Sequence, residues 1–202
     1  MPIKTLVFDF GNVVAFFDHG RAIARLDEYT DVDPVELALV LYGSPIEDAY
    51  ERGAIDTAEY VREGKLNGRL TCSDAQFLSA FAGIFWRNDE VCDLVPKLKP
   101  AYRLVLASNT TPAHFDAYAR QFADTLGHFD FLGTSFGVRA RKPEPEFFSR
   151  LQEHTNAEPG ECLFLDDLPT NVAAAERFGW KGLVYRADGT LADKLRAAGV
   201  GG

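Results

Sequence analysis

The sequence predicts an α/β protein in which a Rossmann-like, mostly parallel sheet carries a helical subdomain inserted after its first strand. Three observations support this prediction: short apolar runs that end in small or polar residues, helical patterns between the later runs, and one interval too long for a single crossover helix. Strands that alternate with helices are typical of a parallel sheet. The chain has 202 residues and 47% hydrophobic content, which is enough to bury a substantial core.

Four apolar runs are predicted to form buried strands. Each is rich in Val, Leu or Phe and is bounded by small or polar residues, which is the pattern of a strand covered on both faces. The runs are "TLVFDF" from Thr5, "YRLVLASN" from Tyr102, "ECLFLDD" from Glu161 and "KGLVY" from Lys181.

Helical patterns fill the intervals between the later strands. The segment "PAHFDAYARQFADTL" from Pro112 has helical spacing that places Phe115, Tyr118, Phe122 and Leu126 on one face. Two further segments follow the same pattern, "PEPEFFSRLQEH" from Pro143 and "PTNVAAAERFG" from Pro169.

The first interval breaks this rhythm, because roughly 90 residues separate the first two strands and a single crossover helix needs far fewer. Its residues 18–87 have helical patterns throughout, and one of them begins with Asp33 as N-cap and Pro34 in the first turn. The predicted helical segments are "RAIARLDEY", "DPVELALVLYG", "DTAEYVREGKLNG" and "SDAQFLSAFAGIF". We therefore predict a helical insert directly after the first strand.

Composition argues against several classes of function. The chain has 21 basic and 30 acidic residues, and its net charge of −9 predicts repulsion from nucleic acid and anionic membranes. No apolar run approaches the ~20 residues that span a bilayer. Cys72, Cys92 and Cys162 lack the spacing of a disulfide framework or a zinc site. We expect a cytoplasmic protein without nucleic-acid or membrane partners.

Polar residues follow the predicted strands at the places where a ligand would bind. In open α/β sheets, ligands bind beyond the carboxyl ends of the strands. Asp9 follows the first strand, the triplet at 108–110 (Ser-Asn-Thr) follows the second, and the pair Asp166-Asp167 follows the third. With Lys142 these residues suit phosphoryl transfer, which depends on positioning and charge neutralisation.

Each of these elements also has a structural interpretation. An Asp or a Ser-Asn-Thr triplet after a strand commonly caps the next helix, and Lys-Pro-Glu commonly starts one. The adjacent carboxylates are harder to explain in this way, because like charges repel unless a cation lies beside them. Asn171 either braces this acidic loop or is an ordinary first-turn residue. His19 and His114 are either proton carriers or, more simply, helix-start or surface residues.

Together these segments resemble the haloacid dehalogenase superfamily of Mg²⁺-dependent phosphatases and their relatives. "VFDFGNVV" is similar to its first motif, "VLASNTT" to its second, "KPEPEFF" with Lys142 to its third and "LFLDDLPTN" to its fourth. The motifs occur in the family's order, and the insert resembles the family's helical cap. The resemblance implies a core domain of residues 1–17 and 88–202 and a cap of residues 18–87.

The resemblance also implies roles for individual residues. Asp9 is expected to be the nucleophile that forms an aspartyl-phosphate, and Lys142 to neutralise the nucleophile and the phosphoryl charge. Mg²⁺ is the expected cofactor. Its ligands are expected to be Asp9, Asp167 and the carbonyl of Gly11, with Asp166 behind them or bound through water. The expected substrate contacts are Phe10, Gly11, Ser108, Asn109 and Lys142.

Gly11 departs from the family pattern. Most phosphatases of the superfamily have an Asp at this position, which protonates the leaving oxygen and then deprotonates water, for a gain of ~10²–10⁴ in rate. One interpretation is a dehalogenase, which needs no such acid but generally lacks the acidic pair of the fourth motif. Another is a binding module without chemistry, which leaves the retained Asp9, Lys142 and acidic pair unexplained.

The interpretation we prefer is a sugar-phosphate phosphatase. In a subgroup that includes bacterial α-glucose-1-phosphate phosphatase, "DxGNV" is the normal first motif, and a sugar leaving from its anomeric carbon needs less help from an acid. The segment "ERGAI" in the insert resembles the same subgroup, which makes Glu51, Arg52 and Arg62 candidate substrate contacts. We expect a Mg²⁺-dependent phosphatase of a small phosphorylated metabolite, as a monomer or weak dimer.

Overall fold

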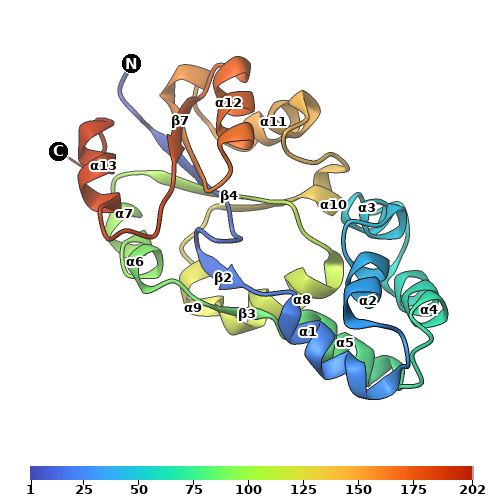
Figure 1. Ribbon diagram of the computed structural model, residues 1–202. Helices are drawn as coiled ribbons and strands as arrows, with labels where there is room; N and C mark the ends of the chain where they lie inside the picture. Colours follow the sequence, from blue (N-terminus) through green and yellow to red (C-terminus); the bar gives the residue numbers. More distant parts are fainter. Residues whose placement is uncertain (202) are drawn as a thin grey trace.

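A five-stranded parallel sheet forms the centre of the computed structural model, which describes residues 1–201 (Figure 1). The strand order is β5-β4-β1-β6-β7, and every neighbouring pair is parallel. The Rossmann-like α/β prediction is therefore confirmed. The strands are β1 (Thr5–Phe8), β4 (Arg103–Ser108), β5 (Phe131–Thr134), β6 (Cys162–Asp166) and β7 (Lys181–Val184).

All four predicted strands are present in this sheet, and its fifth strand was missed. β5 is a short edge strand, "FLGT", that pairs only with β4. Its first two residues are only half-buried, and its third is Gly133. An edge strand of this kind lacks the continuous apolar run of a central strand, so periodicity alone does not find it.

Helices cover both faces of the sheet, because alternate side chains of each strand point to opposite faces. In β1, Leu6 and Phe8 join the apolar cluster on one face, and Val7 joins the cluster on the other. One face packs against α6 (Asp89–Cys92), α7 (Val95–Leu98), α8 (Pro112–Gln121), α9 (Ala123–Leu126) and α13 (Leu191–Ala197), the other against α11 (Pro145–Gln152) and α12 (Pro169–Phe178). Two short elements, α10 (Ser135–Val138) and η2 (Pro159–Glu161), complete the core.

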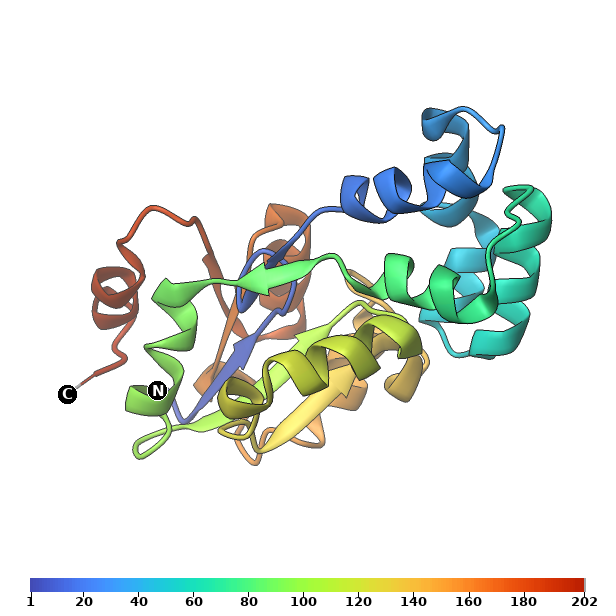
Figure 2. The ribbon, with the colours of Figure 1, turned by 90° about the horizontal axis from the view of Figure 1, so that it is seen from below.

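The insert is helical, as predicted, and has an apolar cluster of its own. Figure 2 shows its helices gathered beyond one end of the sheet. The Asp33 side chain caps the second of them by accepting a hydrogen bond from the Val35 backbone N–H at 2.8 Å. The helices are α1 (Gly20–Leu26), η1 (Asp27–Tyr29), α2 (Pro34–Leu41), α3 (Pro45–Glu51), α4 (Thr57–Asn67) and α5 (Asp74–Ala82). We keep residues 18–87 as the proposed extent of this cap.

A two-stranded ribbon joins the cap to the core. β2 (Ala15–Phe17) pairs in antiparallel register with β3 (Phe85–Arg87), and Phe17 lies opposite Phe85. The chain therefore enters and leaves the cap through neighbouring strands (Figure 2). Each strand has only three residues, so the sequence carries too little periodicity to predict the ribbon.

Ion pairs hold the cap helix α3 against the loop that precedes α11. Arg52 on the cap side donates to Glu144 through two bonds of 3.0 and 2.6 Å. In the opposite direction, Arg141 of the core loop pairs with Asp48 and with Glu51 of α3. No helix within residues 1–201 is long and apolar enough to cross a membrane.

Candidate active site

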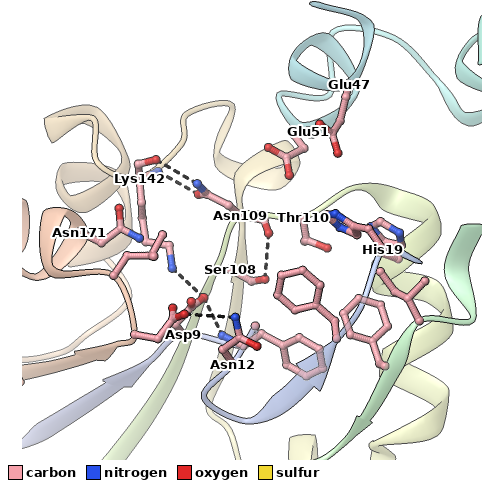
Figure 3. A pocket seen from close by; sticks show the side chains of 18 residues that line it. Asp9, Asn12, His19, Glu47, Glu51, Ser108, Asn109, Thr110, Lys142 and Asn171 are labelled. Atoms are coloured by element: carbon pink, nitrogen blue, oxygen red, sulfur yellow. Dashed lines mark hydrogen bonds and ion pairs between the residues drawn. The ribbon is translucent and has the colours of Figure 1, made fainter. Parts of the chain in front are cut away.

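A cavity of about 280 Å³ lies where the carboxyl ends of the central strands face the cap. Asp9 follows β1, Ser108 ends β4, and Asp166 ends β6. All the site residues predicted from the core motifs except Asp166 line this cavity, and Asp166 is bonded to Lys142 beside it. Figure 3 shows how side chains from these separate elements converge.

Lys142 is the centre of the charge cluster. Its ammonium nitrogen lies 2.7 Å from Asp9 Oδ1 and 2.8 Å from Asp166 Oδ2, and the residue is only 4% exposed. Asn109 holds the backbone of this lysine, because its Nδ2 donates to the Lys142 carbonyl and its Oδ1 accepts from the Lys142 N–H, both at 2.9 Å. Asn109, which directly follows β4, therefore positions Lys142.

Asp166 is fully buried and is bonded on both oxygens. The Asn171 amide donates to Oδ1 at 3.1 Å and to Oδ2 at 3.0 Å, and the Leu168 backbone N–H donates to Oδ1 at 2.8 Å. Asn171 is itself buried in the first turn of α12. Of the two interpretations offered for Asn171, the structure shows the bracing contact.

Asp167 is less buried than its neighbour and accepts a hydrogen bond of 3.2 Å from the Asn12 amide. One oxygen each of Asp9, Asp166 and Asp167 lies within 4.8 Å of the others. Three carboxylates and one lysine carry a net charge of −2. A divalent cation is the partner that balances this charge, and an all-oxygen donor set is the type that Mg²⁺ prefers.

Burial acts on the pKa values of the cluster in opposite directions. Burial raises the pKa of Asp9 to about 7, opposed by Lys142 and assisted by the nearby charge of Asp166. Burial by itself would lower the pKa of Lys142, but the carboxylates of Asp9 and Asp166 outweigh it and hold that pKa above its ordinary value. The lysine therefore stays charged, and an additional cation beside Asp9 would favour its ionised form.

The two residues after Asp9 differ in what they present to the cavity. The Phe10 side chain is buried against Tyr118, with ring centroids 3.7 Å apart, so only its backbone is available to a substrate. Gly11 faces the ring of Phe17: a Cβ added at Gly11 would lie 2.9 Å from Phe17 Cε1 and 3.3 Å from Cδ1. The ring thus fills the space into which a larger residue at Gly11 would extend.

Several residues that the sequence analysis singled out have roles that it did not assign. Asn109, the expected substrate contact, lines the cavity and also holds the Lys142 backbone through its side-chain amide. Arg52 bonds Asp48 and Glu144, and Arg62 is paired on the cap surface, so neither side chain lines the cavity. Of the three cap candidates, Glu51 alone lines it.

The sequence analysis missed six residues of the cavity wall: Asn12, Phe17, Glu47, Ile84, Phe85 and Leu168. Glu47 had a detectable signal. Ser44 caps α3 by accepting the Glu47 N–H at 3.2 Å, Pro45 occupies the first turn, and Glu47 is three residues after the cap. A Ser-Pro pair followed by an acidic first turn is a recognisable helix start.

The sheet order, the helical insert and the lysine among three strand-end carboxylates define a Rossmann-like α/β protein with an acidic site between its core and its cap. Residues 3–179 match the family model described as haloacid dehalogenase-like hydrolase, and the chain belongs to this family.

The chain is similar to characterised members of the family. It is 27% identical over 187 residues to D-ribitol-5-phosphate phosphatase from Bacteroides thetaiotaomicron, covering 89% of this chain and 90% of that protein.

Two solved structures share the fold. The first is a HAD family enzyme of Bacteroides thetaiotaomicron in complex with magnesium and inorganic phosphate, with a TM-score of 0.80, 24% identity and coverage of 92% of this chain and 96% of that one. The second is L-2-haloacid dehalogenase from Xanthobacter autotrophicus, with a TM-score of 0.65, 18% identity and coverage of 98% and 84%.

Proposed function

We propose that this hydrolase is a Mg²⁺-dependent phosphatase that acts on a small phosphorylated metabolite, most plausibly a sugar or polyol phosphate, through an aspartyl-phosphate. The observation that carries the proposal is the cluster of Asp9, Asp166, Asp167 and Lys142, whose net charge of −2 lies at the cavity between core and cap. The phosphatase activity of the relative named above, which acts on a phosphorylated polyol, supports the same class of substrate.

The residues divide the reaction between them. The Asp9 carboxylate attacks phosphorus, the bond from phosphorus to the leaving oxygen breaks, and water then hydrolyses the aspartyl-phosphate and restores Asp9. Lys142 balances the negative charge of Asp9 and of the phosphoryl oxygens. Ser108 and the Asn109 backbone are placed to contact those oxygens, since the Asn109 side chain is occupied elsewhere.

The residues around Asp9 fit Mg²⁺. Asp9, Asp167 and the Gly11 carbonyl would hold the ion, and Asp166 would support them from its bonds with Lys142 and Asn171. When bound, the ion supplies further positive charge for the phosphoryl group.

Gly11 leaves the leaving oxygen without a carboxylic acid from this position. We propose that the substrates turned over best are those whose leaving group departs readily, as a sugar does from its anomeric carbon, with water as the proton source. The resemblance of "DFGNV" to the glucose-1-phosphate phosphatase subgroup motivates this part of the proposal. Equal turnover of alkyl and anomeric sugar phosphates would contradict it.

The proposal is tested by hydrolysis of p-nitrophenyl phosphate with and without Mg²⁺. We expect Asp9→Asn to lower kcat at least about 10⁴-fold, because removal of a nucleophile disables the whole catalytic unit. EDTA should abolish turnover, and added Mg²⁺ should restore it. Retention of full activity by Asp9→Asn contradicts the mechanism. Chloride release from 2-chloropropionate in the presence of EDTA would instead show a dehalogenase.

A further inference from the structure

The end of the cavity away from Asp9 is built from two carboxylates of the cap. Glu47 and Glu51 are four residues apart on α3, so they lie on the same face of the helix. Both line the same cavity as Asp9 and Lys142. Figure 3 shows the two side chains extending from α3 toward the cavity, on the side opposite Asp9.

Local structure explains only part of this arrangement. The Gly43 backbone N–H donates to Glu47 Oε2, which is a helix-start contact, and Arg141 Nη2 lies 2.7 Å from Glu51 Oε2. Within residues 1–201, no cation lies within ion-pairing distance of Glu47. The Glu51 side chain is only 13% exposed. Burial raises the pKa of Glu47 to about 7 and raises that of Glu51, so a ligand that donates hydrogen bonds to these groups would favour their ionised forms.

The other groups at this end of the cavity carry no positive charge. Burial lowers the pKa of His114 to about 3, and the ring is neutral with Nε2 bonded to the Phe81 carbonyl at 3.1 Å. Burial also lowers the pKa of His19, whose ring stacks on Tyr42 with centroids 3.7 Å apart. Among the described residues that line the cavity, Lys142 is the only lysine or arginine.

The cavity is therefore polarised. Its Asp9 end is arranged around a cation and binds phosphoryl oxygens under the proposed function, whereas its cap end offers carboxylate acceptors and neutral rings. Hydroxyl groups are good partners for carboxylate acceptors. A second anion on the substrate would meet Glu47 and Glu51 across a few ångströms of low dielectric, which is unfavourable.

We propose that Glu47 and Glu51 select the leaving group of the substrate: they bind the hydroxyls of a neutral polyhydroxylated carbon chain and reject leaving groups that carry a carboxylate or a second phosphate. This inference rests on the proposed phosphatase function and narrows its substrate class. The volume of about 280 Å³ is near the lower limit of typical small-molecule pockets, roughly 300 Å³, and suits a short chain.

The test compares two six-carbon phosphates that differ only at the end far from phosphate. Glucitol 6-phosphate ends in a hydroxyl, and 6-phosphogluconate ends in a carboxylate. We expect the wild-type enzyme to favour glucitol 6-phosphate in kcat/KM by at least about 10-fold. Glu47→Gln and Glu51→Gln should each reduce that ratio about 3-fold to 10-fold, mainly through a lower KM for 6-phosphogluconate.

The controls separate this inference from the proposed function. Glu36→Gln makes the same charge change at an exposed position of α2 outside the cavity wall, and it should leave the ratio unchanged. Turnover of p-nitrophenyl phosphate, which has neither hydroxyls nor a second ionic group, should change less than about 2-fold in Glu36→Gln. Circular dichroism confirms that each variant is folded.

Two outcomes would overturn the inference. If the wild-type ratio is close to one, or if Glu47→Gln and Glu51→Gln leave the ratio unchanged while p-nitrophenyl phosphate is still hydrolysed, the selection by these carboxylates is wrong and the phosphatase function stands. If wild-type enzyme with Mg²⁺ hydrolyses none of the three phosphates, the proposed function fails and the inference fails with it.

Discussion

The two ends of the cavity are built on different structural principles. On the core side, Asp9, Asp166 and Lys142 stand at or just beyond the ends of strands and loops that the parallel sheet brings together, and the lysine lies 2.7–2.8 Å from both carboxylates. On the cap side, Glu47 and Glu51 project from one helix face; Arg141 pairs with Glu51, and no cation within residues 1–201 pairs with Glu47. The core end is thus organised around a cation, whereas the cap end presents carboxylates to the cavity.

The largest effect should come from breaking the charge cluster at the core end. Lys142→Met removes the cation between two buried carboxylates, and we expect kcat to fall at least about 10³-fold and the free energy of unfolding by about 3 kcal/mol. Denaturant unfolding and p-nitrophenyl phosphate kinetics measure the two effects. Lys99→Met is the matched control, because the Lys99–Asp130 pair is half-exposed and should contribute at most about 1 kcal/mol. A similar loss in both variants would contradict the view of the core end as one charge unit.

A smaller change in activity is expected from substitutions at Gly11 and Phe17, two neighbouring residues of the cavity wall. Gly11→Asp alone places a side chain against the Phe17 ring, so the new acid should be poorly positioned. In the Phe17→Ala background the space is open. Gly11→Asp should then raise kcat/KM for glycerol 3-phosphate about 10-fold to 100-fold relative to Phe17→Ala, since a positioned acid contributes ~10²–10⁴.

Glucose 1-phosphate, used as a second substrate, tests whether the gain depends on the leaving group. Its leaving group needs less protonation, so Gly11→Asp should improve its turnover less than that of glycerol 3-phosphate. The measurement is kcat/KM for both phosphates across the four members of the double-mutant cycle. An equal gain in the presence and absence of the Phe17 ring would show that the ring does not restrict position 11.

The smallest effect concerns the contact of α8 with the cap. The ordinary pKa of His114 is 6.5, and burial lowers it to about 3 in the folded protein. Between these values the unfolded chain binds a proton that the folded chain does not, so stability falls as pH falls, by up to about 1.4 kcal/mol per pH unit.

His114→Gln isolates that contribution, because its amide keeps a donor for the Phe81 carbonyl and does not titrate. The stability difference between wild type and variant, measured by urea unfolding from pH 7 to pH 4.5, should shift against the wild type as pH falls below about 6. Parallel stability curves would mean that folding does not change the pKa of His114.

The sequence predicted the core end of the site far better than the cap end, for a physical reason. A buried parallel strand is a continuous apolar run, and its carboxyl end is where ligands bind, so Asp9, Ser108 and Asp166 are located by the strand pattern itself. Lys142 comes from a loop, and its position depends on the motif resemblance and on the Asn109 contacts that only the fold shows.

Of the two carboxylates at the cap end, only Glu51 was predicted, and only from the motif resemblance, because helical periodicity identifies the buried face of a helix and not the target of its polar face. Glu47 and Glu51 belong to α3, a seven-residue helix that periodicity did not resolve. Phe17 lies in a three-residue strand, and its approach to Gly11 depends on the pairing of segments roughly 70 residues apart. No local sequence pattern predicts how closely the Phe17 ring approaches Gly11.

The ribbon of β2 and β3 has a consequence for how such a protein can change. Because Phe17 and Phe85 are direct partners in the ribbon, the entire cap is, in topological terms, the enlarged turn of a single hairpin. A hairpin turn can grow, shrink or be exchanged without reordering the sheet to which it is attached. The cap can therefore be exchanged as a unit, and a different cap would place different side chains opposite the same hydrolytic core.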